Sequence, residues 1–508
     1  MTSASVSEPG EAPSVNLAAI LTESAAHSPE ALALKLDETE LSYAALDQLS
    51  ARFAGLLRDR GIAAGERILL ISPNLPQMPV AYYGALRHGS VVVPLNPLLK
   101  SREIEYHLKD SEASLVVVWE GVLAEAAPAA AEVDVPVLSI DADFLGLLQA
   151  TEPEVDIAFV TAQQTAVILY TSGTTGRPKG AELTHANLLH NAQITQGLFD
   201  LGEGDVIFGG LPFFHIFGQT CALNAAILSG ATVTLLPRFD PEQALRIIQR
   251  DQATIFQGVP TMYIGLLRAF DPEQHDVSTL RVAVSGGASL PLEVLRGVES
   301  TFDLTLLEGY GLSETSPVVT FNQQDGIRKP GSIGTPVRDA ELRVTDLDGA
   351  ELPRGEVGEL LVRGPQVMKG YWRNPEATAA AIQDGWFATG DLARQDEDGV
   401  FFIVDRKKDM ILRGGYNVYP REVEEVLYEH PAVVEVAVLG KPDTEYGEEV
   451  VAVIALAEGA ASQDGLLEQI QEFAKERLAA YKYPRELRIV PALPKGPTGK
   501  ILKREIEL

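Results

Sequence analysis

Short apolar runs alternate with amphipathic segments through most of the chain. Near its start, Leu46, Leu49 and Phe53 recur at helical spacing, and Ser42 before them is a favourable N-cap, so we expect a helix after a short strand. Short, mainly apolar runs rich in β-branched residues follow and predict buried strands, at residues 67–72, 91–95, 115–119, 165–170, 231–236, 254–259, 280–286 and 304–311. Their alternation with helical segments predicts an α/β fold in which helices cover parallel sheets.

The pattern changes in the last third of the chain. Residues 341–364 are turn-rich with short strands, which predicts a β-rich subdomain, antiparallel or barrel-like. After the charged run at 405–409 the alternation restarts as a compact α+β unit of about one hundred residues. We therefore expect a disordered tail at 1–14, a large N-terminal domain at 15–405 and, after a hinge, a small C-terminal domain at 406–508.

Composition narrows the classes of protein to which the chain can belong. The formal net charge is −30, which argues against general nucleic-acid binding because phosphate backbones require basic surfaces. No uncharged apolar run reaches about 18 residues, so no membrane span is expected, and the tail lacks the features of a signal peptide. Cys221 is the sole cysteine and cannot form an internal disulfide, so a reducing, cytoplasmic location is the simplest expectation.

A loop rich in glycine and hydroxyl groups follows the strand expected at 165–170. Its glycines allow tight turns in which successive N–H groups face an anion, and Lys179 adds positive charge. The spacing differs from that of the GxxxxGK[ST] phosphate loop, because Gly180 follows Lys179 directly. The pattern predicts a phosphate site made by Thr171, Ser172, Gly173, Thr174, Thr175, Gly176 and Lys179.

With further motifs in a fixed order, this loop resembles the adenylate-forming (ANL) superfamily of acyl-CoA synthetases, luciferases and peptide-synthetase adenylation domains. The other motifs are LPFFH at 211–215, EGYGLSET at 308–315, GWFATGD at 385–391, DR at 405–406, GG at 414–415 and PTGK at 497–500. The resemblance covers essentially the whole chain after the tail. It implies an acyl-CoA synthetase of the fatty-acid–CoA ligase type that uses ATP, Mg²⁺ and coenzyme A, with adenylation in the large domain and a mobile small domain.

The resemblance also implies roles for residues of the nucleotide pocket. Thr171 and Glu314 would hold Mg²⁺, and Tyr310 would offer its ring to adenine. Asp391 would accept hydrogen bonds from the ribose hydroxyls, with Arg406 as a second ribose contact. The other nucleotide-pocket positions that it implies are Gly287, Ala288, Glu308, Gly309, Gly311 and Ser313.

Further roles concern catalysis and domain movement. Lys500 is implied as the mobile lysine that contacts the carboxylate and the α-phosphate during adenylation, and His215 as a catalytic residue that borders the acyl pocket. Lys408 would be the hinge about which the small domain turns. Gly414 and Gly415 would line the tunnel for the pantetheine arm of coenzyme A, where side chains would obstruct it.

The implied reaction has two steps. The carboxylate attacks the α-phosphorus of ATP and pyrophosphate leaves; the thiol of coenzyme A then displaces AMP. Residues 211–226 carry no acidic side chain, which disfavours an amino acid, and Gly311 stands where acetate-using relatives place tryptophan. We therefore expect a medium- or long-chain fatty acid, with a cinnamate-like aryl acid as the alternative.

Other functional classes remain open from the sequence. The enzyme could be an acyl-AMP ligase that loads an acyl carrier protein, or a luciferase-like oxygenase, in place of a coenzyme A ligase. A non-enzymatic ATP-binding regulator would leave Glu314 and Lys500 without a use. The expected partners are a small carboxylic acid and coenzyme A, without nucleic acid.

Overall fold

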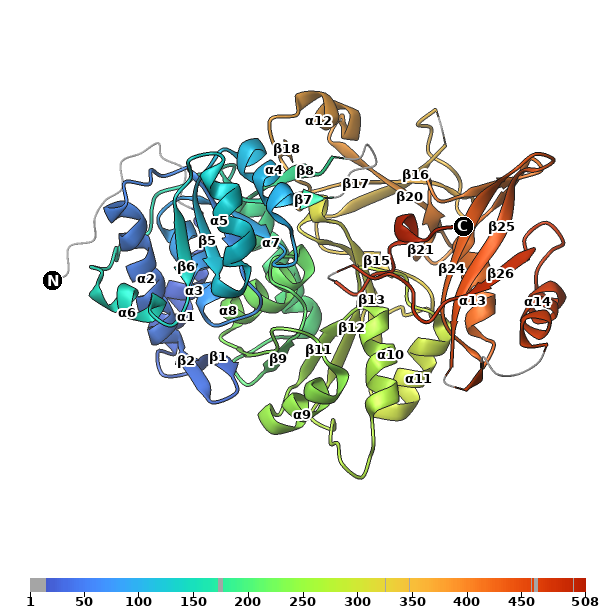
Figure 1. The fold of residues 1–508 in the computed structure, drawn as a ribbon, viewed down its shortest axis with the longest axis horizontal. Helices are drawn as coiled ribbons and strands as arrows, with labels where there is room; N and C mark the ends of the chain where they lie inside the picture. Colours follow the sequence, from blue (N-terminus) through green and yellow to red (C-terminus); the bar gives the residue numbers. More distant parts are fainter. Residues whose placement is uncertain are drawn as a thin grey trace. The chain divides into compact units, whose positions relative to one another are not determined.

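A computed structural model describes residues 15–171, 177–324, 326–346, 348–457, 459–460, 465–496 and 498–508. The tail at 1–14 and the phosphate-loop residues 172–176 lie outside these ranges. The chain divides into two compact units, shown as a ribbon in Figure 1. Unit 1 comprises Met1–Arg238, Ser313–Pro317 and Pro365–Thr378, and unit 2 comprises Phe239–Leu312, Val318–Gly364 and Ala379–Leu508. The boundary expected at 405/406 is a different division and stays a prediction.

Unit 1 contains alternating helices and strands, as the apolar pattern predicts. Its elements are α1 (Ala19–His27), β1 (Leu32–Leu36), β2 (Thr39–Ser42), α2 (Tyr43–Asp59), β3 (Arg67–Ile71), α3 (Gln77–Arg87), β4 (Val91–Leu95), α4 (Ser101–Ser111), β5 (Ala113–Trp119), η1 (Glu120–Val122), α5 (Leu123–Ala131), β6 (Val137–Ile140), α6 (Phe144–Ala150), β7 (Thr165–Thr171), β8 (Lys179–Thr184), α7 (His185–Phe199), β9 (Val206–Gly209), the π-helix η2 (Phe217–Asn224), α8 (Ala225–Ser229), β10 (Thr232–Leu235), η3 (Ser313–Thr315) and β18 (Gly370–Tyr371). The helix α12 (Pro375–Ala381) begins in this unit.

One sheet of unit 1 has seven strands, in the order β18-β8-β7-β4-β3-β5-β6, and β9, β10, β1 and β2 pair with one another in a second sheet. Strands β7, β4, β3, β5 and β6 pair in parallel, and their apolar side chains pack with those of α4 and α5 in one buried cluster. The sheet is mixed, because β8 returns antiparallel to β7 with Lys179 opposite Thr171. The sequence did not predict this hairpin, since the segment of β8 is not an uninterrupted apolar run.

Unit 2 begins with an α/β segment and continues into two smaller sheets. Its elements are α9 (Pro241–Asp251), β11 (Ile255–Gly258), α10 (Pro260–Ala269), β12 (Val282–Ser285), α11 (Leu292–Phe302), β13 (Leu306–Gly311), β14 (Val318–Phe321), β15 (Thr335–Pro336), β16 (Glu341–Thr345), β17 (Gly358–Arg363), β19 (Ile382–Gln383), β20 (Trp386–Gln395), β21 (Phe401–Arg406), β22 (Ile411–Arg413), β23 (Tyr416–Val418), α13 (Pro420–Tyr428), β24 (Val433–Asp443), β25 (Gly447–Leu456), α14 (Leu466–Arg477), β26 (Glu486–Ile489) and η5 (Lys503–Glu505).

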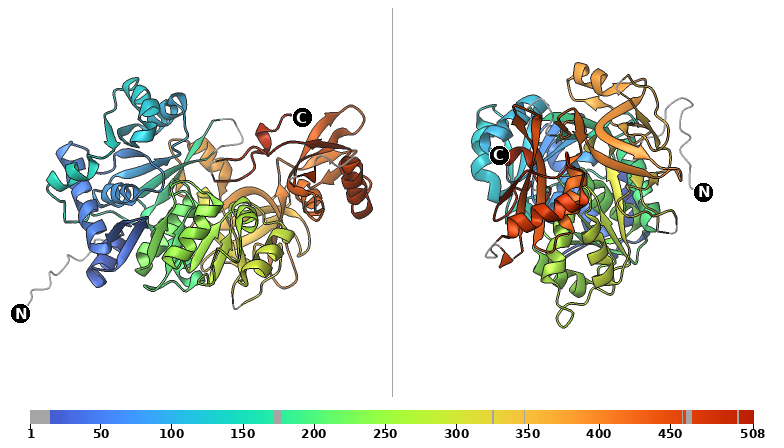
Figure 2. Two further views of the ribbon diagram at one scale, coloured as in Figure 1. Left: turned by 60° about the horizontal axis from the view of Figure 1, so that its bottom comes forward. Right: turned by 90° about the vertical axis from the view of Figure 1, so that its right-hand side faces the viewer.

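The sheets of unit 2 follow the predicted change from parallel to antiparallel. Strands β11, β12 and β13 are parallel, whereas β16, β17, β19, β20 and β21 form an antiparallel sheet with its own core around Phe401. The last sheet has the order β23-β22-β25-β24, with β26 beside β25, and it packs against α13 and α14 (Figure 2). This mixed α/β architecture, with a β-rich subdomain and a small C-terminal α+β part, confirms the predicted fold class.

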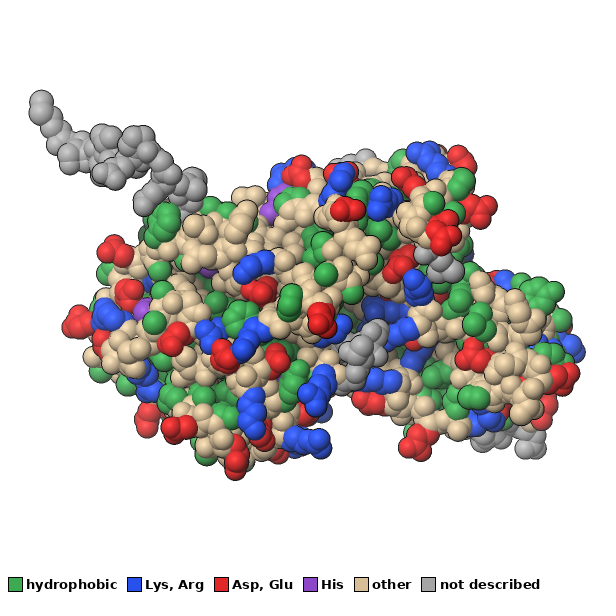
Figure 3. Space-filling model, turned by 90° about the horizontal axis from the view of Figure 1, so that it is seen from above, with side chains coloured by type: hydrophobic (Ala, Val, Ile, Leu, Met, Phe, Trp, Pro, Cys, Tyr) green, Lys and Arg blue, Asp and Glu red, His purple; other side chains and the backbone are tan. Residues whose placement is uncertain are grey.

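Two further findings concern the charged side chains at the surface and the hydropathy of the helices. Acidic and basic side chains are interspersed over the face drawn in Figure 3. Among the helices that the structure describes, none has the length and apolar character needed to cross a bilayer.

Candidate active site

In unit 1 the end of β7 meets the short helix η3, and this contact brings together two predicted site residues. The Thr171 hydroxyl donates to Glu314 Oε1 at 3.4 Å, and the Tyr371 hydroxyl donates to the same oxygen at 3.0 Å. The Met368 amide donates to the carbonyl of Glu314, which fixes the backbone of η3. Lys179 lies with its ammonium 5.1 Å from the centre of the Tyr371 ring. The structure thus places Thr171, Lys179 and Glu314 in one group, with Tyr371 as a member that the sequence did not reveal.

The Thr171 hydroxyl and the Glu314 carboxylate offer two oxygen ligands. This number suits Mg²⁺ better than a metal ion whose coordination shell consists of protein side chains alone. Within the described ranges, no cluster of three or more His, Cys, Asp or Glu side chains could hold a metal ion. Mg²⁺ prefers one or two protein oxygens, with phosphates and water completing the shell. A carboxylate from Glu314 and a hydroxyl from Thr171 fit that requirement, and Mg²⁺ bound there would neutralise charge on the phosphates of ATP.

We expect Glu314→Ala to raise the Mg²⁺ concentration needed for half-maximal adenylation and to lower the adenylation rate, because the site loses the carboxylate of Glu314. The measurement is pyrophosphate release at increasing Mg²⁺ concentrations. Tyr371→Phe is the matched control, because it removes a hydrogen bond to Glu314 but leaves the carboxylate. An unchanged Mg²⁺ dependence in the Glu314 variant would remove this residue from the metal site.

His215 also belongs to unit 1, just before the π-helix η2. Its Nδ1 accepts a hydrogen bond from the Phe217 amide at 3.3 Å, so the neutral ring carries its proton on Nε2. The segment around it is apolar: Phe213 and Cys221 are fully buried. Burial raises the pKa of the Cys221 thiol to about 12, which agrees with a packing role for this cysteine and not a nucleophilic one.

In unit 2 the predicted ribose carboxylate is held by two neighbours. Asp391 lies on β20 directly opposite Arg406 of β21, and Arg406 Nε is 2.8 Å from Asp391 Oδ1. The hydroxyl of Tyr310 donates to Asp391 Oδ2 at 2.5 Å. Asp391 is only 2% exposed, so these contacts fix its orientation. The structure brings Asp391, Arg406 and Tyr310 together in one group, while the contacts with ribose and adenine stay predictions.

Lys500 lies close to this group because the turn before it is attached to α10. The Thr261 hydroxyl donates to the Gly499 carbonyl at 2.8 Å, and Gly499 has a φ of +82°, which favours glycine. Surrounding protein atoms and then the Arg406 guanidinium lower the pKa of Lys500 to about 8, and Asp391 partly opposes them. The side chain also keeps contact with solvent, which limits the first of these effects. The sequence did not reveal Thr261, which lies far from any motif.

Glu308 has a structural position that the sequence did not suggest. Its side chain is 3% exposed, Oε1 accepts from the Leu290 amide at 3.1 Å, and Oε2 has no hydrogen-bond partner among the described residues. Burial raises the pKa of Glu308 to about 7, although the nearby Arg421 guanidinium lowers it in part. The carbonyl of Glu308 accepts from Asn322, so its contact with ATP stays a prediction while its packing role is clear.

The burial of Glu308 predicts a pH-dependent stability. The ordinary pKa of 4.5 is raised to about 7 in the folded protein, so the unfolded chain ionises first as pH rises and stability falls between these values. We expect Glu308→Gln to remove this loss, which amounts to roughly 3 kcal/mol at pH 8 and is absent near pH 4. Urea unfolding of both proteins at pH 5 to 8 measures it. Glu293→Gln, an exposed change on α11, is the control, and parallel pH profiles for wild type and the Glu308 variant would contradict the argument.

Several of the glycines that were predicted as site residues lie at turns or strand ends. Gly414 and Gly415 form the two-residue turn between β22 and β23, with φ of +58° and +81°. A hairpin turn of this kind favours glycine, so the backbone explains both residues, and their place in a thiol tunnel stays a prediction. Gly287 follows β12 with a φ of +75°.

The remaining predicted positions are placed as follows. Ala288 comes next to Gly287 after β12, Gly309 and Gly311 belong to β13, Ser313 begins η3, and Lys408 lies in the turn after β21. The ends of β12 and β13 are neighbours because these strands pair in parallel, and ligands bind at this edge of parallel sheets. The loop residues Ser172, Gly173, Thr174, Thr175 and Gly176 lie outside the described part of the chain.

Comparisons with known proteins agree with the resemblance to the adenylate-forming superfamily. The family of AMP-binding enzymes matches residues 21–372, and the C-terminal domain of AMP-binding enzymes matches residues 422–500. A long-chain-fatty-acid–CoA ligase of Bacillus subtilis (strain 168) is 39% identical over 97% of this chain and 94% of its own length. A feruloyl-CoA synthase of an Amycolatopsis species is 38% identical over 94% of this chain and 96% of its own length.

A solved structure shows the same fold. The crystal structure of the anthranilate CoA ligase AuaEII in complex with anthranoyl-AMP superposes with a TM-score of 0.92 at 30% identity, and covers 97% of this chain and 96% of that one. The family match extends over more than half of the chain, and the relatives span nearly all of it. The chain therefore belongs to the AMP-binding enzyme family of the adenylate-forming superfamily and is an AMP-forming acid–CoA ligase.

Proposed function

We propose that this ATP-dependent ligase activates a medium- or long-chain fatty acid and transfers the acyl group to coenzyme A. The observation that carries the proposal is the buried, uncharged segment after His215. Residues of the π-helix η2 are all buried, and residues 211–226 include no Asp, Glu, Lys or Arg. A charged acyl tail would have no partner there, whereas an apolar tail needs none.

The reaction needs no protein nucleophile. A carboxylate oxygen attacks the α-phosphorus of ATP and pyrophosphate leaves, and the thiol sulfur of coenzyme A then attacks the acyl carbon and AMP leaves. Both reactants of the first step are anions, so the ammonium groups of Lys500 and Lys179 would offset their repulsion and the growing charge. Asp391, held by Tyr310 and Arg406, would orient the nucleotide through its ribose.

An aryl acid is the second candidate, and one observation favours it. Gln219 Oε1 and Thr220 Oγ1 are buried in η2 and have no hydrogen-bond partner within the described part of the chain. Buried polar atoms are normally paired, so a substrate with a polar ring substituent would satisfy them.

A panel of acids measured by pyrophosphate release tests the proposal. We expect kcat/KM to rise with chain length from acetate to a long-chain acid, and to exceed the values for cinnamate, ferulate and malonate. A parallel assay of thioester formation with free coenzyme A tests the acceptor. A preference for the hydroxylated aryl acid that is lost in Gln219→Leu would replace the first candidate with the second.

A further inference from the structure

Helix α4 lies behind the strands that carry the predicted Mg²⁺ group. Thr171, Lys179 and Tyr371 stand at the ends of the neighbouring strands β7, β8 and β18. Successive side chains of a strand point to opposite faces of a sheet, so the residues next to these three face the other way. On that face, Tyr170 and Trp372 pack against the buried cluster that includes apolar side chains of α4. The Mg²⁺ group and the helix are therefore on opposite faces of one sheet.

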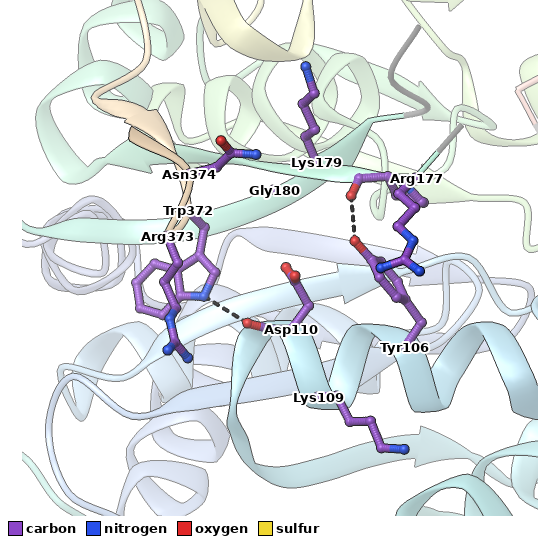
Figure 4. Close-up of a pocket in the computed structure, with 10 residues that line it drawn as sticks. Tyr106, Lys109, Asp110, Arg177, Lys179, Gly180, Trp372, Arg373 and Asn374 are labelled. Atoms are coloured by element: carbon purple, nitrogen blue, oxygen red, sulfur yellow. Dashed lines mark hydrogen bonds between the residues drawn. The ribbon is translucent and has the colours of Figure 1, made fainter. Parts of the chain in front are cut away.

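Two residues of α4, about one helical turn apart, form hydrogen bonds with these strands and their ends. Asp110 Oδ2 accepts from the Tyr170 hydroxyl at 2.6 Å, and the Asp110 carbonyl accepts from Trp372 Nε1 at 3.0 Å. The Tyr106 hydroxyl donates to the Pro178 carbonyl at 2.7 Å. Figure 4 shows the last two contacts as dashed lines. Each contact thus reaches a residue that is the direct sequence neighbour of a member of the Mg²⁺ group.

The space between α4 and β8 is not closely packed. A pocket of about 420 Å³ opens there, and Tyr106, Asp110, Pro178 and Trp372 are among the residues that line it (Figure 4). Protein interiors are normally close-packed, and that packing keeps strands in place. Beside the pocket, packing contributes less to the position of β8. The hydrogen bonds from α4 therefore have a larger share in holding this strand and the residues at its start.

We propose that Tyr106 and Asp110 are positioning residues for adenylation, which hold Lys179 and Thr171 in the geometry that binds Mg²⁺ and the phosphates of ATP. The inference rests on the adenylation step of the proposed function. The two residues would act through the neighbours of the Mg²⁺ group, from the opposite face of the sheet and without contact with ATP. A metal ligand and a charged donor stabilise a transition state only where they are already in place, and a displacement of about 1 Å is costly.

The test removes the two hydroxyl groups and keeps their rings, in Tyr106→Phe, Tyr170→Phe and the double variant. In the double variant we expect the KM for ATP to rise about tenfold, the result if the site holds its binding geometry for about a tenth of the time. Thioester formation from supplied acyl-adenylate should change little, because pyrophosphate has already left. Tyr43→Phe is the matched control in unit 1, because the Tyr43 hydroxyl donates to the Ala231 carbonyl at 2.7 Å, a contact between α2 and the start of β10. This variant should keep the wild-type KM for ATP.

Two variants of Asp110 show whether the hydrogen bond with Tyr170 carries the effect. Asp110→Asn keeps a side-chain oxygen that can accept from the Tyr170 hydroxyl, so its KM for ATP should stay close to the wild-type value. Asp110→Ala loses the acceptor and should match Tyr170→Phe. Because these two changes remove the same contact, Asp110→Ala combined with Tyr170→Phe should raise the KM for ATP no further than either change alone.

A binding measurement keeps the test independent of turnover. In calorimetric titrations with Mg²⁺ present, the Kd for ATP should rise in the double variant, while that for AMP should stay unchanged because AMP lacks the two phosphates that leave as pyrophosphate. An unchanged Kd for ATP in a folded double variant, an equal loss for AMP, or an equal loss in Tyr43→Phe would overturn the proposal. If the titrations give the expected pattern but the wild-type enzyme forms no thioester from any acid, the proposed function alone is contradicted.

Discussion

Replacement of Lys500 by alanine is expected to slow adenylation by roughly 10²–10³-fold, the usual consequence of losing one preorganised charged contact to a transition state. The lysine lies beside Arg406 and the Asp391 carboxylate, where ATP would present its α-phosphate. Thioester formation from supplied acyl-adenylate should change far less, because the small domain is proposed to carry Lys500 away before the second step. Separate assays of the two half-reactions measure both effects.

The lowered pKa of Lys500 adds a pH dependence to this result. Lys500 is useful as a cation, so wild-type adenylation should fall as pH rises through about 8. Lys500→Arg, which stays protonated, should lose this decline even if its rate is lower. Lys475→Ala, which removes an exposed lysine of α14, is the control for a general loss of charge. Equal losses in both half-reactions of the Lys500→Ala enzyme would end this assignment.

Gly311→Trp is expected to abolish activity on long-chain acids while weak activity on acetate or propionate is retained or gained. A glycine at this position would leave a channel for an acyl tail, and each methylene buried there should contribute roughly 0.8 kcal/mol. Tryptophan would fill the channel close to the carboxyl end. Gly311 lies in strand β13 opposite Val318, an extended conformation that other residues can adopt, so backbone strain is not expected.

The decisive measurement is kcat/KM against acid chain length for wild type, Gly311→Ala and Gly311→Trp. The alanine variant should shorten the preferred chain slightly, because it adds one carbon where tryptophan adds a ring. Thermal melting has to show that each variant is folded. A folded Gly311→Trp enzyme with an unchanged chain-length profile would show that the acyl tail runs elsewhere.

The fold class could be predicted because buried strands consist mainly of apolar residues, and such runs can be recognised in the sequence. The mainly apolar runs at 67–72, 91–95 and 115–119 became β3, β4 and β5, since parallel strands covered on both faces have apolar interiors. The N-cap expected at Ser42 is present, and its side chain accepts from the Ala45 amide. The antiparallel return of β8 escaped prediction, because its segment mixes charged, polar and apolar residues.

The sequence by itself determined which residues to consider, and the tertiary structure decided how they are paired. Motif positions named Asp391, Arg406 and Tyr310, yet only the register of β20 with β21 and the position of β13 place all three in contact. The buried carboxylate of Glu308 and the Thr261 contact that anchors the Lys500 turn have no local signature in the sequence. Each depends on side chains far apart in the chain, so burial and charge at these points exist only once the sheets have formed.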